Sequence, residues 1–268
     1  TASAGTSNTR VGVNAGNSIE SGGEKNVVVG DEAGTAITTG DFTTAIGYAA
    51  GEAVTTGRLN TLIGGLAGDA LTVGERNTVV GATALSADTQ GSRAVAIGQS
   101  ALATQNFTSA TDNYNVAVGY GAGSQVTTGK FNTLIGGLAG DAITTGQRNA
   151  VVGHQALSTN TASNNTAVGY HSLSANTTGT DNVAIGANAL DANTTASNNT
   201  GIGDNALGAN TTGADNVAVG ADALDNNTTG ASNTAVGKGS LTSNSTADSN
   251  TAVGFFALLS NTTGASNT

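Results

Sequence analysis

The side chains that could carry chemistry in this chain are few and scattered. Its 268 residues include two histidines, His154 and His171, and no cysteine, which excludes cysteine nucleophiles, thiolate metal sites and disulfides. No serine, histidine and aspartate set has a recognisable local signature, and the many glycines do not follow the spacing of a phosphate-binding loop. We therefore expect no enzyme, no catalytic residue and no cofactor.

Two small groups of residues could attract a cation. His154 and His171 occupy neighbouring repeats of the pattern described below, and three carboxylates, Asp204, Asp222 and Asp225, lie close in the same pattern. Carboxylate oxygens are suitable ligands for a hard cation such as Ca²⁺. Exposed histidines and solvated carboxylates that maintain solubility are the simpler interpretation, so the sequence predicts no metal site.

Aromatic side chains are the remaining candidates for binding. Tyr48, Tyr120, Tyr170 and Phe255 each follow a repeated glycine, at a position where other repeats carry polar residues. We expect this column to be exposed. Its rings could stack on sugars or on a partner protein, although isolated aromatics are also normal on protein surfaces.

One interval of the repeat is longer than the others and should protrude as a loop near residues 103–114. It carries two further candidate contact residues, Phe107 and Tyr114. Loops on rigid scaffolds often carry function, but a tolerated insertion is the simpler interpretation.

A repeat of 17 residues must position all of these side chains. Its anchors run from Asn8 to Asn267, and 12 of the 15 intervals between them are 17 residues long, the others being 18, 21 and 16. With the anchor as coil position 1, the consensus is N-T-A-V-G-x-x-A-L-x-x-N-T-T-G-x-x. The segment NTLIGGLAGDA at 60–70 recurs unchanged at 132–142. We expect residues 1–268 to form one repeat array without separate domains, in which units contact mainly their neighbours.

Each repeat predicts one short strand between two corners. Position 4 is Val or Ile in every complete coil and position 5 is always Gly, which is typical of a strand followed by a corner with positive φ or close backbone approach. Gly at position 15 marks a second corner in most coils, and Ala or Ser at position 8 predicts a tight interior site.

The orientation of the strand decides which residues form its outer face, because adjacent strand residues point to opposite sides. If positions 2 and 4 face the interior, the Ala, Val and Leu at position 3 form an outward apolar stripe.

Positions 9 and 12 exchange their residue types without exception. Six coils have Gly at position 9 with Ile, Val or Leu at position 12, and nine have Leu at position 9 with a polar residue at position 12. We infer that both positions approach one interior volume, which a single branched side chain fills. Two such side chains would overpack the volume at a cost of about 1–3 kcal/mol, and none would leave a cavity costing about 2–5 kcal/mol.

The asparagines at positions 1 and 12 should stack from coil to coil as hydrogen-bonded ladders, as in cross-β structures. Such ladders also explain the N-x-[ST] sequons at Asn176, Asn193 and Asn210 without glycans. The fold class predicted is all-β, a β-solenoid or β-roll of about 15 coils.

Threonine recurs at positions 13 and 14 in most coils. Regular columns of threonine could order water, so ice binding is an alternative function.

Composition excludes several classes of protein. The net charge of −10, with only eight basic residues, makes nucleic acid an unsuitable partner, and no apolar run has the length of a membrane span. Nine aromatic residues, without Trp or Met, cannot fill a thick globular core.

The stability of a single chain is marginal. Burial of two or three aliphatic side chains per coil barely offsets the conformational entropy lost when the coil becomes ordered. Together with the outward stripe and the absence of polar capping repeats, this predicts lateral association of identical chains with end-to-end continuation.

The strand motif N-[TV]-A-[VI]-G-x-x-A-[LG], for example NVAIGANAL at 182–190, resembles two groups of proteins. One is the head repeat of trimeric autotransporter adhesins, to which RAVAIG at 93–98 is most similar; the other is the shaft repeat of phage tail fibres. The resemblance implies a homotrimeric β-roll. The function expected is that of a non-catalytic structural shaft of an extracellular fibre or adhesin. Direct binding of a host-surface glycan or protein is the first alternative and ice binding the second.

Overall fold

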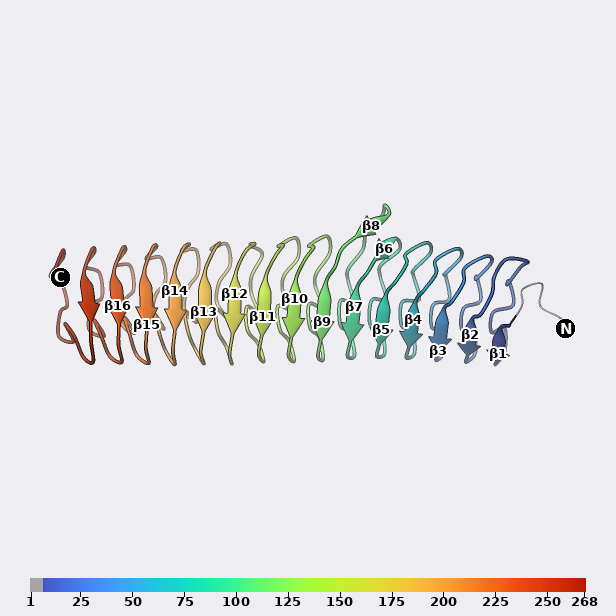
Figure 1. Ribbon diagram of the computed structural model, residues 1–268, viewed down its shortest axis with the longest axis horizontal. Coiled ribbons are helices and arrows are strands. Elements are labelled where there is room, and N and C mark those ends of the chain that lie inside the picture. Colours follow the sequence, from blue (N-terminus) through green and yellow to red (C-terminus); the bar gives the residue numbers. More distant parts are fainter. Residues whose placement is uncertain (1–6) are drawn as a thin grey trace. The chain divides into compact units, whose positions relative to one another are not determined.

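The computed structural model describes residues 7–268 and shows a parallel β-solenoid of about 15 coils, as the repeat predicts. Each coil contributes one three-residue strand, and Figure 1 shows the strands of each part side by side in chain order. The chain forms two compact units, Thr1–Asn132 and Thr133–Thr268. Within residues 7–268, no helix has the length and apolar character needed to cross a membrane.

The first unit contains a main sheet and a small second sheet. Its main strands are β1 (Thr9–Val11), β2 (Val27–Val29), β3 (Thr44–Ile46), β4 (Thr61–Ile63), β5 (Thr78–Val80), β7 (Val95–Ile97) and β9 (Val116–Val118). The pairs are parallel and in register, with Thr44 opposite Thr61 in the next coil. The second sheet pairs β6 (Gly91–Ser92) with β8 (Thr111–Asp112), and also in parallel.

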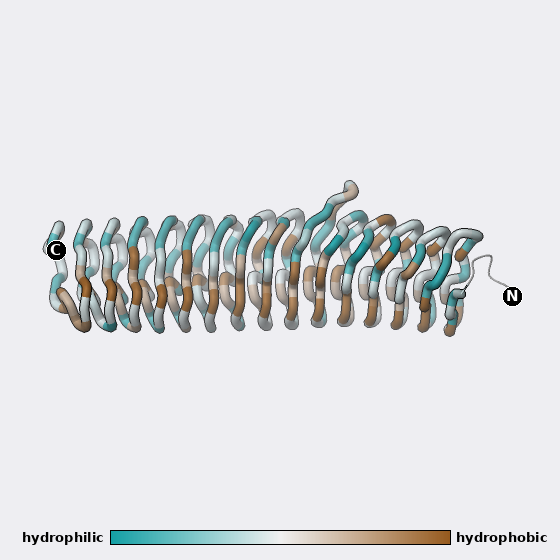
Figure 2. The backbone as a smooth tube through the Cα atoms, in the orientation of Figure 1, coloured by the Kyte–Doolittle hydropathy of each residue, from teal (hydrophilic) through white to brown (hydrophobic). Residues whose placement is uncertain are grey.

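The second unit repeats the same arrangement without an added sheet among its described residues. Its strands are β10 (Thr133–Ile135), β11 (Ala150–Val152), β12 (Thr166–Val168), β13 (Val183–Ile185), β14 (Thr200–Ile202), β15 (Val217–Val219), β16 (Thr234–Val236) and β17 (Thr251–Val253). Figure 2 shows that apolar residues recur once per coil along these strands. The sequence repeat is therefore a spatial repeat, with each residue lying above its equivalent.

The predicted outward stripe at position 3 is wrong. That prediction required positions 2 and 4 to face the interior of the coil, and the strands have the opposite orientation. Position 3 points inward: Ala45, Leu62 and Ala184 have no exposed surface. Position 4 points outward, and Ile46 and Ile185 are 36% and 38% exposed. The outward stripe therefore consists of the Val and Ile at position 4, beside the mostly Thr and Val residues at position 2.

The thin interior explains this orientation. A branched side chain from position 9 or 12 already fills each coil, so the opposite wall accepts only a small residue in most coils. The two coils with Leu at position 3, Leu62 and Leu134, have Gly at position 9. Positions 2 and 4 are β-branched in nearly every coil and face outward because strand side chains alternate.

The shared interior volume of positions 9 and 12 is confirmed. Leu190 and Asn193 of one coil are both fully buried, as is Ile37 of a coil that has Gly34 at position 9. A Cβ atom on Gly34 would lie 2.7 Å from Cδ1 of Ile37. A leucine therefore does not fit beside the isoleucine without displacing it.

Both asparagine ladders are present. At position 1, Oδ1 of Asn182 accepts the backbone N–H of Asn199 at 3.0 Å, and its Nδ2 donates to the carbonyl of Ala196 at 2.9 Å. At position 12, Nδ2 of Asn193 donates to Oδ1 of Asn176 at 2.8 Å. These bonds satisfy amides that lie inside the coil, as buried polar groups require, and they bury the asparagines of the sequons.

Two structural features explain why position 5 is glycine in every coil. Gly30 has φ of +131°, a conformation that side chains disfavour, and an added Cβ would lie 2.5 Å from the carbonyl oxygen of Gly47. At position 15 a Cβ on Gly40 would lie 2.5 Å from the carbonyl oxygen of Gly57, although Ala196 and Ala247 occupy this position in two other coils. Position 5 is therefore the corner that requires glycine in every coil.

Candidate functional site

The long interval of the repeat protrudes from the first unit. Figure 1 shows the segment around β8 rising beyond the neighbouring turns. At the base of this loop, Oδ1 of Asp88 accepts the backbone N–H groups of Gly91 and Phe107 at 2.9 and 3.1 Å. Nε2 of Gln105 donates to Oδ2 of the same carboxylate at 2.7 Å. Asp88 thus fixes the point at which the extra residues leave the coil.

The two aromatic residues predicted as loop contacts have different surroundings. Phe107 is only 7% exposed, so it packs at the base of the loop and is not available to a surface partner. Tyr114 is 49% exposed, and its ring stacks near Phe131 with 6.0 Å between ring centroids. The guanidinium of Arg93 lies 5.6 Å from the Tyr114 ring centroid. Tyr114 alone therefore remains a candidate contact of the loop.

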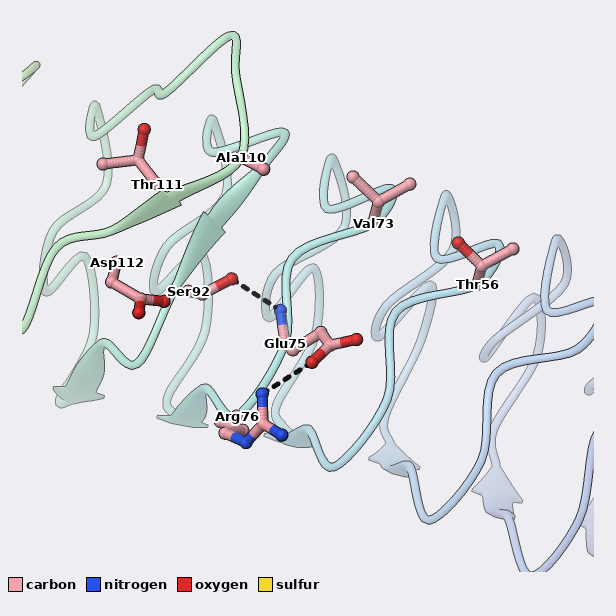
Figure 3. Close-up of a pocket in the computed structure, with 8 residues that line it drawn as sticks. All are labelled: Thr56, Val73, Glu75, Arg76, Ser92, Ala110, Thr111 and Asp112. Atoms are coloured by element: carbon pink, nitrogen blue, oxygen red, sulfur yellow. Dashed lines mark hydrogen bonds and ion pairs between the residues drawn. The ribbon is translucent and has the colours of Figure 1, made fainter.

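A shallow groove of about 520 Å³ lies beside the loop. Thr56, Val73, Glu75, Arg76 and Ser92 line it together with loop residues 110–112, as Figure 3 shows. Most of these side chains carry hydrogen-bonding groups, so the groove suits a polar ligand better than an apolar one.

Ion pairs hold the charged side chains of the groove in place. Glu75 accepts from Nη1 of Arg76 at 2.6 Å and from Nε of Arg58 at 2.9 Å, and its backbone N–H donates to Oγ of Ser92 at 3.0 Å. Nε of Arg93 lies 2.8 Å from Oδ2 of Asp112, and this partner raises the pKa of the exposed guanidinium. Surface ion pairs contribute little stability singly, but a network of them orders long side chains.

Position 17 flanks the groove and has a left-handed backbone conformation in both units. In the second unit most of its residues are Asn, Asp or Ser, such as Asn198 and Asp215 with φ of 62° and 59°, and Arg148 is the exception. In the first unit it carries bulky residues, whose exposed fractions lie between 44% and 49%: Phe42, Leu59, Tyr114 and Phe131. Left-handed backbone costs about 1–2 kcal/mol per residue, and these half-exposed side chains offset little of that cost by burial.

The predicted aromatic column at position 6 is exposed but not continuous. Tyr48, Tyr120, Tyr170 and Phe255 are 62%, 60%, 53% and 72% exposed. Tyr48 and Tyr120 lie four coil spacings apart in the first unit, and Tyr170 and Phe255 lie five apart in the second. The structure therefore brings no two of them together within a unit. The bulky residues at position 17 and the arginines of the groove were missed by sequence reasoning, although their restriction to the first half of the chain is visible in the sequence.

The two histidines flank a tyrosine. Tyr170 stacks on His171 with 4.1 Å between ring centroids and on His154 with 6.0 Å. His171 also hydrogen-bonds through Nε2 to Oε1 of Gln155 at 2.7 Å. Among the described residues, no group of three or more His, Asp or Glu side chains could hold a metal ion.

Burial raises the pKa of the Asp225 carboxyl, and repulsion from Asp222, Asp191 and Asp204 raises it further. These carboxylates therefore repel one another across neighbouring coils. Solvated side chains are sufficient to explain them.

The threonine columns differ in exposure. At position 13, hydroxyls such as that of Thr194 donate to the backbone carbonyl of the next coil, here Thr211 at 3.1 Å. At position 14 the threonines, including Thr195 and Thr212, are exposed. The pair thus provides one exposed column, as the alternation of adjacent side chains predicts.

Comparison of the chain with family models, with curated proteins and with solved structures finds no significant match.

Proposed function

We propose that this chain is a non-catalytic structural shaft of an extracellular fibre or adhesin, built by lateral association of identical chains as a homotrimer. The observation that carries the proposal is the outward face of the strands. Positions 2 and 4 of every coil carry only Thr, Val, Ile or Ala, without a charge or a glycine, from Thr44 and Ile46 in one unit to Thr234 and Val236 in the other. A long apolar face of this kind is typical of a surface that meets a partner.

A second copy of the chain is the partner that this face suits. The face repeats with the spacing of the coils, so an identical face offers the same period along its whole length. The net charge of the chain is −10, and most of its surface therefore repels other copies, whereas the strand face carries no charge to oppose contact. Backbone ladders within each unit and apolar packing between chains together make a stiff spacer.

Sedimentation velocity and single-cysteine cross-linking test the association. The chain contains no cysteine, so Ile185→Cys on the strand face and Thr195→Cys at exposed position 14 form a matched pair. We expect the unmodified protein to sediment as a trimer, and mild oxidation to cross-link the first variant and not the second. A folded monomer at all concentrations would overturn the proposal, as would equal cross-linking of both variants.

The exposed threonine column at position 14 supports ice binding as a second candidate function. Thr195, Thr212 and Thr229 present hydroxyls at the spacing of the coils, about 4.8 Å. A thermal hysteresis measurement tests it, with Thr212→Tyr as the disrupting variant. Loss of activity in this variant would favour ice binding, and the absence of hysteresis in the unmodified protein excludes it.

A further inference from the structure

The basic residues of the chain gather along one edge. Six of the eight lysines and arginines occupy positions 16 and 17 of their coils, and five of these lie in the first unit: Lys25, Arg58, Arg76, Arg93 and Lys130. Three carboxylates share those positions in this unit, Glu24, Asp41 and Glu75, and a fourth, Asp112, is equivalent to position 16 because it pairs with Ser92. We call positions 16 and 17 of residues 24–131 the mixed-charge edge. Its charge of 5 − 4 = +1 contrasts with −10 for the whole chain.

The mixed-charge edge also carries large apolar side chains at an unfavourable backbone conformation. Phe42, Leu59, Tyr114 and Phe131 have φ between 53° and 62°, and about half of each side chain is exposed. The second unit shows that Asn, Asp or Ser at this position maintains the same coil. Folding therefore does not explain the bulky residues, and strain of this kind is typical of functional sites.

Aromatic rings and ion-paired groups lie next to one another along this edge. Arg93 joins the Tyr114 ring to Asp112, and Glu75 joins Arg76 to Arg58 across one coil spacing. Because the carboxylates already orient the guanidinium groups, the groove presents donors and acceptors in a fixed pattern. An apolar surface borders them at Leu59 and Tyr114, both exposed.

We propose that the mixed-charge edge and its groove bind an oligosaccharide. A sugar ring has hydroxyl groups that pair with carboxylates and guanidinium groups, and apolar C–H faces that pack on aromatic rings. The open, polar groove suits a ligand that lies along a surface, and it does not enclose a compact apolar molecule. The four carboxylates disfavour a polyphosphate chain such as nucleic acid. This adhesive role is independent of lateral association through the strand face.

An array of immobilised oligosaccharides, followed by calorimetric titration of the strongest binder, tests the proposal on the full chain. Tyr114→Asn and Arg76→Ala remove an aromatic ring and a guanidinium from the edge. Tyr48→Ala removes an aromatic of the position 6 column, and Asp215→Ala alters position 17 of the second unit. Asn is a residue that position 17 accepts elsewhere in the chain, so Tyr114→Asn should fold with an unchanged or higher melting temperature.

We expect Tyr114→Asn and Arg76→Ala each to weaken binding by about tenfold or more, and the two control variants to bind normally. The sedimentation coefficient should stay unchanged in all four variants, which separates this result from a failure of the shaft proposal. Absence of any binding at millimolar sugar would overturn the inference. Full binding by Tyr114→Asn and Arg76→Ala, or equal losses in Tyr48→Ala, would overturn it as well.

Discussion

Exchanging the residues at positions 9 and 12 of one coil measures whether they fill a single volume. In the coil that begins at Asn182, the change is Leu190→Gly with Asn193→Ile, which copies the arrangement of coils such as that of Gly34 and Ile37. Each single variant should destabilise the coil, and the double variant should recover most of the loss. The quantity of interest is therefore the coupling free energy of a double-mutant cycle.

The expected cost of Leu190→Gly follows from the burial and backbone of this residue. Leu190 is fully buried and contacts the next coil, since a Cβ on Gly201 would lie 3.3 Å from its Cγ. Removal of a buried leucine side chain costs about 2–5 kcal/mol. Its φ of 53° favours glycine, which returns about 1–2 kcal/mol. We expect a net destabilisation of about 1–3 kcal/mol.

The cost of Asn193→Ile has two sources. A second branched side chain in the filled coil costs about 1–3 kcal/mol. Loss of the amide also leaves Oδ1 of Asn176 without the Nδ2 donor that lies 2.8 Å away, and an unpaired buried acceptor costs about 1–3 kcal/mol. In the double variant only the loss of the Asn193 hydrogen bonds remains, which join this amide to Asn176, Asn210 and the carbonyl of Ala196. The coupling free energy should thus be about 2 kcal/mol or more, of the rescuing sign.

Hydrogen exchange of the strand amides at 183–185 is the suitable assay, because a repeat array does not unfold in one two-state step. The control is Leu190→Gly with Thr195→Ile, which adds the same side chain at an exposed position and should give no rescue. If the effects of Leu190→Gly and Asn193→Ile simply add to within about 0.5 kcal/mol, the two positions do not share a volume and the reasoning is wrong.

Three further predictions concern the corners, the ladder and the carboxylates. Gly203→Ala should destabilise the array by about 1–3 kcal/mol, because an added Cβ would lie 2.5 Å from the backbone of the next coil at φ of +138°; Gly65→Ala, which has nothing within 4 Å, should leave the melting temperature unchanged. Asn182→Ala leaves the N–H of Asn199 without its acceptor and should lower stability by about 1–3 kcal/mol in urea titrations, whereas a neutral result would show that the ladder is dispensable. Burial raises the folded-state pKa of Asp88 above its ordinary value of 3.8, so its contribution to stability is complete below that value and is lost as pH rises through the raised pKa. Melting curves should show higher stability in mildly acidic than in neutral buffer, with a weaker dependence in Asp88→Asn; the opposite slope would contradict the assigned cause.

The sequence was sufficient to predict the coil because its constraints recur in each repeat. The glycine at position 5 and the exchange between Leu190 and Asn193 each have one physical cause, and repetition separates that cause from chance. The inward direction of position 3 could not be decided, because Ala is acceptable on either side of a strand. Only the fit of Leu62 opposite a Gly at position 9 distinguishes the two orientations, and this requires knowing the width of the coil.

The candidate site was harder to predict because it departs from the repeat. The protruding loop was evident from the longer interval, but the burial of Phe107 depends on Asp88, whose role is visible only in three dimensions. The bulky residues at position 17, such as Phe42, become informative once the left-handed backbone there is known. Without that knowledge, the aromatic residues at positions 6 and 17 are equally plausible as binding residues, and the sequence analysis selected the column at position 6.

The one-to-one stacking of equivalent atoms limits how such a chain can change its length in evolution. The asparagine ladder bonds join equivalent residues of neighbouring coils, as between Asn182 and Asn199, and the backbone bonds of the strands join residues 16 or 18 apart, as between Thr200 and Asn216. Gain or loss of a whole coil restores every partner. The intervals of 18 and 16 residues show that a coil accepts a change of one residue, whereas the longer insertion near 107–112 protrudes from the solenoid. Recombination can therefore change the length of the solenoid in steps of one coil, while the cross-section of each coil and its outward faces stay the same.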